Sequence, residues 1–408
     1  MASALTPPPS SPVATGLARL LSDNERLRAL RSSRYGLITN PTAVDRAARH
    51  AIDLLFEADC PPHALFAPEH GIWGAAQDQI RIDAARDPHT GLPVHSLYGS
   101  DVDSLEPTEA MLAGLDLLVF DIQDVGARYY TYVYTLAYAM KAAARRGLQV
   151  WALDRPNPIT GRAVEGGPLL PECRSFVGLF DLPHRHGLTA GELALLFNKR
   201  EGINCALDVV TMSGWTRPMW FDQTGLPWVL PSPNMPTPDT ALVYPGMCLL
   251  EGTELSEGRG TTRPFELWGA PWVDPHRLAR ALNDLALPGA RFRATFFEPT
   301  FQKHAGQPCG GVQLHVTDRD AFAPVRTGVH CIAAAYAQWR EHRPEAVGPF
   351  WRTRAYEFLE HWAIDRLAGS PALREAIERG ADLAPLLAAW TAHAARFAAE
   401  RMPYLLYR

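Results

Sequence analysis

The feature that most constrains the fold of this 408-residue chain is a set of short strands that are apolar on both faces. The segments DLLVFDIQ (116–123) and LQVWALD (148–154) lack the polar–apolar alternation of a strand that has one face in water. Such strands are typical of parallel sheets covered by helices on both sides. Neighbouring parallel strands must be joined by long connections, which are usually helices. The sequence between the strands must therefore supply helices.

The first half of the chain meets this requirement. Thr189 and Glu192 have the spacing of a capping box, which marks the start of a helix. The predicted strands lie at 35–40, 63–68, 92–99, 116–123, 148–154 and 205–212. The predicted helices lie at 16–30, 47–59, 108–115, 132–147 and 189–202. We therefore predict an α/β fold, with a Rossmann-like, doubly wound and mostly parallel sheet in an N-terminal domain over 15–228.

The second half has a different texture. Residues 213–275 are rich in Pro, Gly and Trp and show little periodicity, which is more often functional loop than idle linker. Helices are predicted at 275–285, 327–342 and over most of 371–407, and strands at 291–299 and 310–318. We expect a smaller α+β C-terminal domain over 229–408. Residues 1–14 are expected to be a disordered tail.

Composition excludes several classes of protein. The chain is 47% hydrophobic with a net charge of −5, so it can bury large cores and has no basic surface for nucleic acid. Its six cysteines form no C-x-x-C pair, so neither a zinc cluster nor a dense disulfide framework is expected. No run of 18 apolar residues could span a membrane. Because the first residues do not resemble a signal peptide, we expect a cytoplasmic protein, or a periplasmic or secreted one if a leader is missing.

Polar and aromatic side chains follow the predicted strands at their carboxyl ends. These ends meet at one edge of an open parallel sheet, where ligands bind. The sequence therefore predicts a cleft at this edge. The candidate ligand contacts there are Asn40, His70, Asp121, Gln123, Asp124, Arg128, Tyr129, Tyr130, Asp154 and Asn157.

Several chemistries find little support. The first strand is followed by TNPTAVDR rather than G-x-G-x-x-G, and the chain has neither a P-loop nor a G-x-S-x-G elbow. No cofactor is expected. His184 and His186 have a metal-ligand spacing but lie alone on a loop sequence. A metal-dependent hydrolase that uses Asp121, Asp124 and Asp154 remains an alternative.

Carboxylate chemistry remains. Glu69 lies in LFAPEHGIWG (65–74), and Glu165 lies in GRAVEGGPL (161–169). Two carboxylates across a cleft are the minimum for cleaving a glycosidic bond, because one protonates the departing oxygen while the other acts at the anomeric carbon. The neighbours of Glu69, which are His70, Gly71 and Trp73, suggest a partly desolvated pocket that suits a general acid.

Eight blocks of the sequence, in order, resemble the exo-β-N-acetylmuramidases of bacterial cell-wall turnover. They are GLITNPTAVDR, LFAPEHGIWGAAQ, FDIQDVGARYYTYVYTL, LDRPNPITG, VEGGPL, HGLTAGELA, PSPNMPT and YPGMCLLEGTELSEGRGTTRPFE. The resemblance implies a Rossmann-like domain and a smaller domain that closes the active-site cleft. It also implies hydrolysis of the β-1,4 bond of non-reducing terminal N-acetylmuramic acid (MurNAc) in fragments such as MurNAc-GlcNAc. Glu69 and Glu165 match the family's leading catalytic candidates.

The implied substrate sets further expectations. MurNAc carries a lactyl carboxylate, so the pocket needs a cation, for which Arg128, Arg259 and Arg263 are the candidates. Asn234 and Glu257, in the later matching blocks, are also expected to bind substrate. The 2-acetamido group is itself a candidate nucleophile at the anomeric carbon, so retaining, inverting and substrate-assisted mechanisms all stay open. A two-lobed sugar-binding or sensor protein without turnover is a further alternative, and the oligomeric state is left open.

Overall fold

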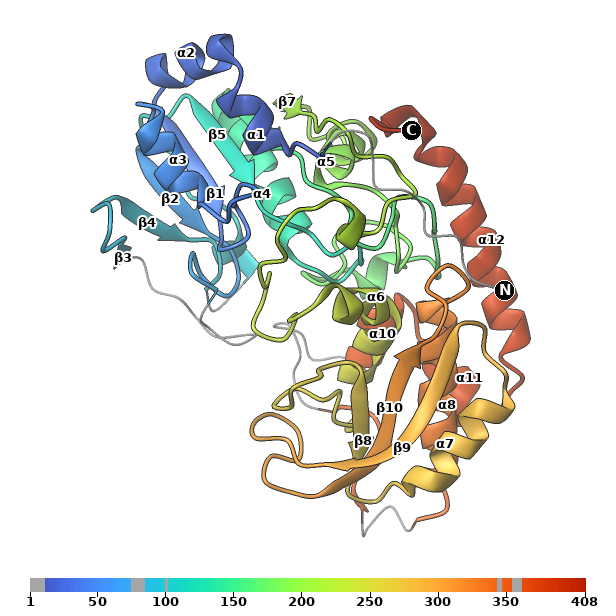
Figure 1. Ribbon diagram of the computed structural model, residues 1–408. Coiled ribbons are helices and arrows are strands. Elements are labelled where there is room, and N and C mark those ends of the chain that lie inside the picture. Colours follow the sequence, from blue (N-terminus) through green and yellow to red (C-terminus); the bar gives the residue numbers. More distant parts are fainter. Residues whose placement is uncertain (1–11, 75–84, 100–101, 343–346, 354–361) are drawn as a thin grey trace.

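A computed structural model describes residues 12–74, 85–99, 102–342, 347–353 and 362–408. These residues form a seven-stranded sheet in the first half of the chain and a three-stranded sheet in the second half (Figure 1). The first sheet contains β1 (Tyr35–Thr39), β2 (Ala64–Ala67), β3 (Ala85–Arg86), β4 (Pro93–Ser96), β5 (Leu117–Asp121), β6 (Gln149–Leu153) and β7 (Ala206–Val210). All six predicted strands of this half are present, and the α/β prediction is confirmed.

The strand order of the first sheet is β3-β4-β2-β1-β5-β6-β7, and every pair except β3–β4 is parallel. The chain starts in the middle of the sheet at β1, builds outward to one side, and then crosses to β5. This is the order of a doubly wound dinucleotide-type fold, with its topological switch point between β1 and β5. The connections after β1 and β5 lead to opposite sides of the sheet at this point, which is where such folds bind their ligands.

Helices cover both faces of the first sheet, as the doubly apolar strands require. Leu117 and Val119 of β5 pack in one buried cluster with residues of α1 (Gly16–Leu21), α2 (Asn24–Ser32) and α3 (Ala51–Glu57). Leu118 and Phe120 pack in another cluster with residues of α4 (Tyr132–Arg146) and α5 (Ala190–Arg200). Alternate side chains of one strand therefore enter two different cores.

The second sheet is antiparallel, in the order β8 (Leu267–Ala270), β10 (Cys309–Val316) and β9 (Ala290–Phe297). It packs with α7 (Pro275–Asp284) and α8 (Pro324–Trp339). Phe120 of the first sheet and Val312 of the second belong to the same cluster of buried side chains. The two sheets are therefore joined by a continuous apolar core.

The C-terminal segment returns to the first sheet. It forms α10 (Ala363–Ala368), α11 (Ala372–Glu378), α12 (Ala384–Glu400) and the 3-10 helix η5 (Met402–Tyr404), and α12 runs up the side of the molecule toward the first half (Figure 1). Trp390 of α12 stacks on His184 with ring centroids 4.8 Å apart. The Tyr407 hydroxyl donates to Asp154 Oδ2 at 2.6 Å. The C-terminal segment thus packs against the outer surface of the first half of the chain.

Some local predictions were wrong. Residues 108–115 form turns rather than a helix, since a segment this short between Pro107 and Gly114 has little to stabilise a helical nucleus. The predicted helix at 16–30 is two helices, because Asp23 caps the start of α2 by accepting from the backbone N–H groups of Glu25 and Arg26. The prediction of a disordered tail falls mostly outside the described residues. Ala14 is ordered, and its N–H donates to the carbonyl of Ser213 at 2.9 Å.

The irregular region also contains structure that periodicity did not indicate. It holds α6 (Pro238–Met247), the 3-10 helix η4 (Cys248–Gly252) and β8. None of the helices in the described ranges has both the length and the apolar character needed to cross a membrane.

Candidate active site

A strained turn places Glu69 at the end of β2. His70 and Gly71 both have a positive φ, at 69° and 82°, and the Gly71 N–H donates to the carbonyl of Pro68 at 3.0 Å. Glycine adopts this conformation freely, but for histidine it costs roughly 1–3 kcal/mol. Strain of this kind is concentrated at functional sites. Glu69 itself is 6% exposed, and its Oε2 accepts from the Thr131 hydroxyl at 2.9 Å.

Glu69 lines a cavity at the junction of the two halves of the chain. The cavity has about 520 Å³ of empty space, a figure that includes its open mouth. It lies beyond the carboxyl ends of β2 and β5, the edge that the sequence predicts. The lining residues are Glu69, His70, Tyr129, Tyr130, Thr131, Tyr132, Val177, Ser232, Asn234, Met235, Tyr244, Glu251, Arg259 and Phe265.

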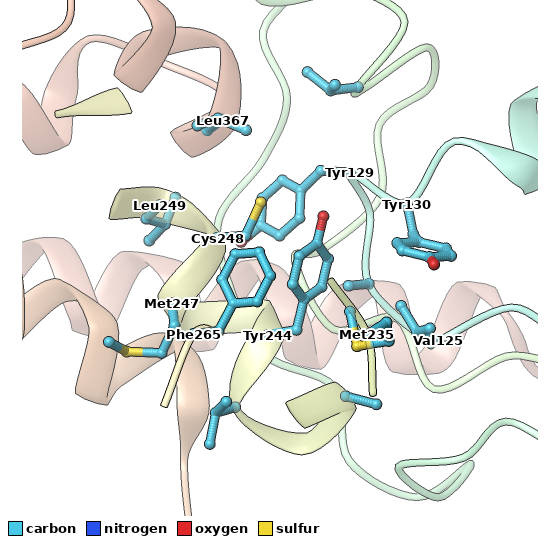
Figure 2. Close-up of a cluster of buried hydrophobic side chains, with 14 of the residues drawn as sticks. Val125, Tyr129, Tyr130, Met235, Tyr244, Met247, Cys248, Leu249, Phe265 and Leu367 are labelled. Atoms are coloured by element: carbon cyan, nitrogen blue, oxygen red, sulfur yellow. The ribbon is translucent and has the colours of Figure 1, made fainter. Parts of the chain in front are cut away.

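Aromatic rings form much of the wall, and they come from both halves of the chain (Figure 2). Tyr244 meets Phe265 edge to face at 4.9 Å between centroids, and it meets Tyr130 in the same way at 5.7 Å. The Tyr129 hydroxyl donates to the carbonyl of Pro245, which ties the β5 loop to α6. Burial raises the pKa of Tyr129 and of Tyr130 well above the usual range, so both phenols stay neutral.

A second carboxylate lines the same cavity together with a cation. Arg259 Nη2 pairs with Glu251 Oε1 at 2.8 Å, and Arg259 Nε pairs with Glu257 Oε1 at 3.2 Å. Lys303 Nζ lies 2.9 Å from the other oxygen of Glu257. Burial alone would raise the pKa of Glu257, but Lys303 and Arg259 together lower it. The result is a rigid, alternating row of charges with Glu251 at its cavity end.

Six of the predicted site residues line this cavity: Glu69, His70, Tyr129, Tyr130, Asn234 and Arg259. The other predicted residues do not. They are Glu165, Asn40, Asp121, Gln123, Asp124, Arg128, Asp154, Asn157, Glu257 and Arg263. Their contacts explain why.

Glu165 holds the two halves of the chain together. Its Oε1 pairs with Arg185 Nη1 at 2.9 Å, and its Oε2 accepts from the Val325 N–H at the start of α8 at 3.3 Å. Burial raises the pKa of Glu165, and Arg185 opposes that shift. This placement does not fit the expectation that Glu165 faces Glu69 across the cavity. An acid at a helix N-terminus is instead a favourable structural contact.

Arg128 is likewise a structural residue. Its side chain is fully buried, and its guanidinium donates to the carbonyls of Gly167, Leu182 and Leu367 at 3.1, 2.8 and 2.7 Å. Leu367 belongs to α10, so this arginine also joins the two halves. Its full burial outside the cavity does not fit the prediction that it binds the lactyl group. Arg263 lies outside the cavity and pairs with Glu266 at 3.3 Å.

The three aspartates of the metal-dependent alternative are held by protein donors. Asp121 accepts from Arg155 at 2.5 and 2.9 Å. Asp154 accepts from the hydroxyls of Thr189 and Tyr407. Asp124 Oδ2 accepts from the Gly126 N–H at 2.7 Å, and burial raises the pKa of Asp124 to about 7. Within the described ranges, no three His, Cys, Asp or Glu side chains are grouped so as to hold a metal ion.

The amides predicted to bind substrate shape the loops instead. Asn40 Oδ1 accepts from the N–H and the hydroxyl of Thr42. Gln123 Nε2 donates to the carbonyls of Asp124 and Pro156. Asn157 Nδ2 donates to the carbonyl of Leu188 at 2.9 Å. These polar residues follow strands, as predicted, but they satisfy loop backbone rather than face the cavity.

Sequence reasoning missed Glu251 and the aromatic residues Tyr244 and Phe265. All three lie within the longest block of the family resemblance, YPGMCLLEGTELSEGRGTTRPFE, which contains the glutamates Glu251, Glu254, Glu257 and Glu266. The block was therefore a usable signal. The block offers no way to choose among its four glutamates, and the prediction names Glu257 rather than Glu251.

Comparison with known proteins agrees with this architecture. The N-terminal model of the exo-beta-N-acetylmuramidase NamZ family matches residues 35–239, and the C-terminal model matches 242–407. The chain is 47% identical over 396 residues to the peptidoglycan beta-N-acetylmuramidase NamZ of Bacillus subtilis (strain 168), covering 97% of this chain and 91% of the relative.

Two crystal structures of DUF1343 family proteins from Bacteroides fragilis NCTC 9343 are also similar. One has a TM-score of 0.86 at 35% identity and covers 98% of this chain and 100% of its own. The other has a TM-score of 0.75 at 28% identity and covers 98% of this chain and 99% of its own. With both family models matched in order along nearly the whole chain, the protein belongs to the exo-beta-N-acetylmuramidase NamZ family.

Proposed function

We propose that this protein is an exo-β-N-acetylmuramidase. It would hydrolyse the β-1,4 bond of the non-reducing terminal MurNAc in peptidoglycan fragments such as MurNAc-GlcNAc. The observation that carries the proposal is Glu69, a buried carboxylic acid on a strained turn that lines an aromatic cavity in a chain of this family. A saccharide is the partner that such a cavity suits, since tyrosine rings offer flat apolar surface and hydroxyl groups together.

Glu69 is the general acid of the proposed reaction. Hydrolysis needs a proton on the glycosidic oxygen as its bond to the anomeric carbon breaks, because the departing sugar alkoxide is otherwise a poor leaving group. A carboxyl group that is 6% exposed and held by the Thr131 hydroxyl has a fixed position for that transfer. The strained turn supports the same role, since backbone strain persists where surrounding structure fixes one geometry.

Arg259 is the proposed partner of the lactyl carboxylate. Of the three arginines considered from the sequence, it is the one that lines the cavity. A guanidinium can meet a planar carboxylate at two points. Arg259 is already paired with Glu251 and Glu257, so the preference for MurNAc over a terminal GlcNAc, which has no lactyl group, would come from the added contact between Arg259 and the lactyl carboxylate.

The test is release of free MurNAc from MurNAc-GlcNAc by the purified protein and by Glu69→Gln. We expect the variant to lose about 10²–10⁴-fold in kcat, the usual contribution of a positioned acid. Glu57→Gln is the matched control, because the side chain of Glu57 is 62% exposed on α3. Activity of Glu69→Gln within about tenfold of wild type would remove Glu69 as the acid. No release by the wild type would end the functional proposal.

We propose separately that the protein is located in the cytoplasm. All six cysteines are free and buried, which is compatible with the reducing cytoplasm. Fractionation of cells that produce the natural protein, followed by immunoblotting, would test this location.

A further inference from the structure

We propose that Glu251 is the second catalytic carboxylate and acts at the anomeric carbon opposite Glu69. The inference rests on the proposed glycosidase function and deepens it. It gives the second role to a residue in the other half of the chain, whereas the sequence pointed to Glu165.

The first argument for Glu251 is its position in the wall of the cavity. Among the described residues that line it, Glu69 and Glu251 are the carboxylic acids. Each is only 6% exposed, although charged side chains are rarely buried without a reason. They come from distant segments, because Glu69 follows β2 of the first sheet and Glu251 lies in η4 after α6. Bringing two acids from separate segments to one cavity is what glycosidic cleavage requires.

The partners of Glu251 assign its role. Glu251 Oε1 pairs with Arg259 Nη2 at 2.8 Å, which holds the carboxyl group in one position at the cavity wall. Arg259 is itself fixed by Glu257, which is bound in turn by Lys303. A carboxyl group fixed at the cavity wall in this way is suited to hold a water molecule against the anomeric carbon. The acid role proposed above stays with Glu69.

The reaction can then be written with every atom placed. Glu69 gives its proton to the glycosidic oxygen, and the electron pair of the bond between the anomeric carbon and that oxygen leaves with GlcNAc. A water oxygen bonds to the anomeric carbon, and the Glu251 carboxylate takes a proton from that water. One water is consumed, and MurNAc and GlcNAc are released. Glu69 is left ionised and Glu251 protonated, and exchange of protons with solvent restores both.

Glu165 cannot serve this purpose in the observed geometry. Its two oxygens are bound to Arg185 and to the backbone of α8, and it lies outside the set of residues that line the cavity. Glu257 also lies outside that set, although it contacts Arg259 as Glu251 does. These two residues are therefore informative comparisons for Glu251.

The experiment uses two substrates, MurNAc-GlcNAc and 4-nitrophenyl β-MurNAc. Nitrophenolate leaves without help from an acid, whereas the sugar alkoxide does not. We expect Glu251→Gln to lower kcat by about 10²–10⁴-fold on both substrates. Glu69→Gln should lower it by a similar factor on the disaccharide and much less on the nitrophenyl glycoside. If Glu251→Gln lowers kcat on the disaccharide but leaves kcat on the nitrophenyl glycoside unchanged, the assignment is overturned.

Glu257→Gln separates catalysis from positioning. It removes a carboxylate partner of Arg259 without removing a group that lines the cavity. We expect it to raise KM for MurNAc-GlcNAc more than it lowers kcat. An equal loss of kcat in Glu257→Gln and Glu251→Gln would mean that Glu251 acts only through Arg259. A larger loss of kcat in Glu165→Gln than in Glu251→Gln would return the role to Glu165.

Chemical rescue gives a readout that a structural role would not produce. In Glu251→Gly, added azide should attack the anomeric carbon without needing a base, raise the rate and yield MurNAc azide. Circular dichroism first establishes that the variant is folded, and Glu251→Gln is the less disruptive replacement if it is not. A folded Glu251→Gly that azide neither accelerates nor converts to the azide product would refute the proposal. If instead the wild type releases no MurNAc, the functional proposal fails first.

Discussion

The buried ion pair between Asp121 and Arg155 offers a sharp test of what holds the ligand-binding edge of the first sheet together. Asp121 is the last residue of β5, and Arg155 follows β6. Their side chains are 0% and 4% exposed, and the guanidinium grips both carboxylate oxygens, at 2.5 and 2.9 Å. Arg155 also donates to the carbonyl of Val44. The pair thus joins two strand ends to the loop after β1.

We expect Arg155→Met to destabilise the protein by about 3–5 kcal/mol, because it leaves a buried carboxylate without its charge partner. The Coulomb attraction has the same size, since unit charges ~4 Å apart at an effective dielectric constant of ~20 attract by about 4 kcal/mol. Replacing both partners, as in Asp121→Leu with Arg155→Met, should recover most of the loss, because the desolvation cost of both charges disappears.

The assay is urea unfolding followed by circular dichroism, with all four members of the double-mutant cycle measured at one pH. Arg277→Met is the control, because Arg277 and Glu341 form an ion pair whose side chains are 56% and 52% exposed. The urea midpoint of this variant should stay close to that of the wild type. A loss below about 1 kcal/mol in Arg155→Met, or a double variant no more stable than the single one, would refute the reasoning.

Two further predictions concern charge. Asp124 has its pKa raised by burial from 3.8 to about 7, so between these values the folded state holds a proton that the unfolded state has lost, and stability falls as pH rises through this window. The free energy of unfolding of Asp124→Asn, measured by urea unfolding at a series of pH values, should therefore rise relative to that of the wild type by up to roughly 4 kcal/mol between pH 4 and pH 8. A difference that does not change with pH would contradict this. Arg259→Lys should raise KM for MurNAc-GlcNAc about tenfold, since lysine cannot make the two-point contact; an unchanged KM would count against lactyl binding.

The fold was predictable where local sequence and tertiary packing agree. Strands such as β5 are buried on both faces, so their sequences show uninterrupted apolar residues, and the parallel pairing of β1 with β5 agrees with the predicted sheet. The start of α5 was predictable because the Thr189–Glu192 capping box is local, and both of its hydrogen bonds are present.

The fold was not predictable where burial removes periodicity. In α6 every residue from Thr240 to Met247 is buried, so the helix has no polar stripe to reveal its period. Pro238 occupies its first turn, where proline is tolerated, but Pro245 lies inside the helix and makes the sequence look like loop. The segment that carries Glu251 into the cavity was hidden for the same reason.

The candidate site was predictable on one side only. The P-E-H-G turn sits at the end of a recognisable strand, so Glu69 and His70 could be placed at the ligand edge from the sequence. Glu251 could not, because its position depends on how the second half packs against the first. The sequence of a matching block does not distinguish a glutamate that lines the cavity from one that joins two segments. Glu165 and Glu257 are of the second kind.

The residues that do not line the cavity explain how its two walls keep their spacing. Glu69 and Glu251 belong to different halves, so their separation is set by whatever fixes one half against the other. Arg128 bonds the β5 loop to the carbonyl of Leu367, and Glu165 bonds the start of α8. Catalytic groups must be held to within a fraction of an ångström, and a misplacement of about 1 Å can cost 10²-fold in rate. Buried charges outside the cavity can therefore be as necessary for turnover as the two acids proposed to act on the sugar.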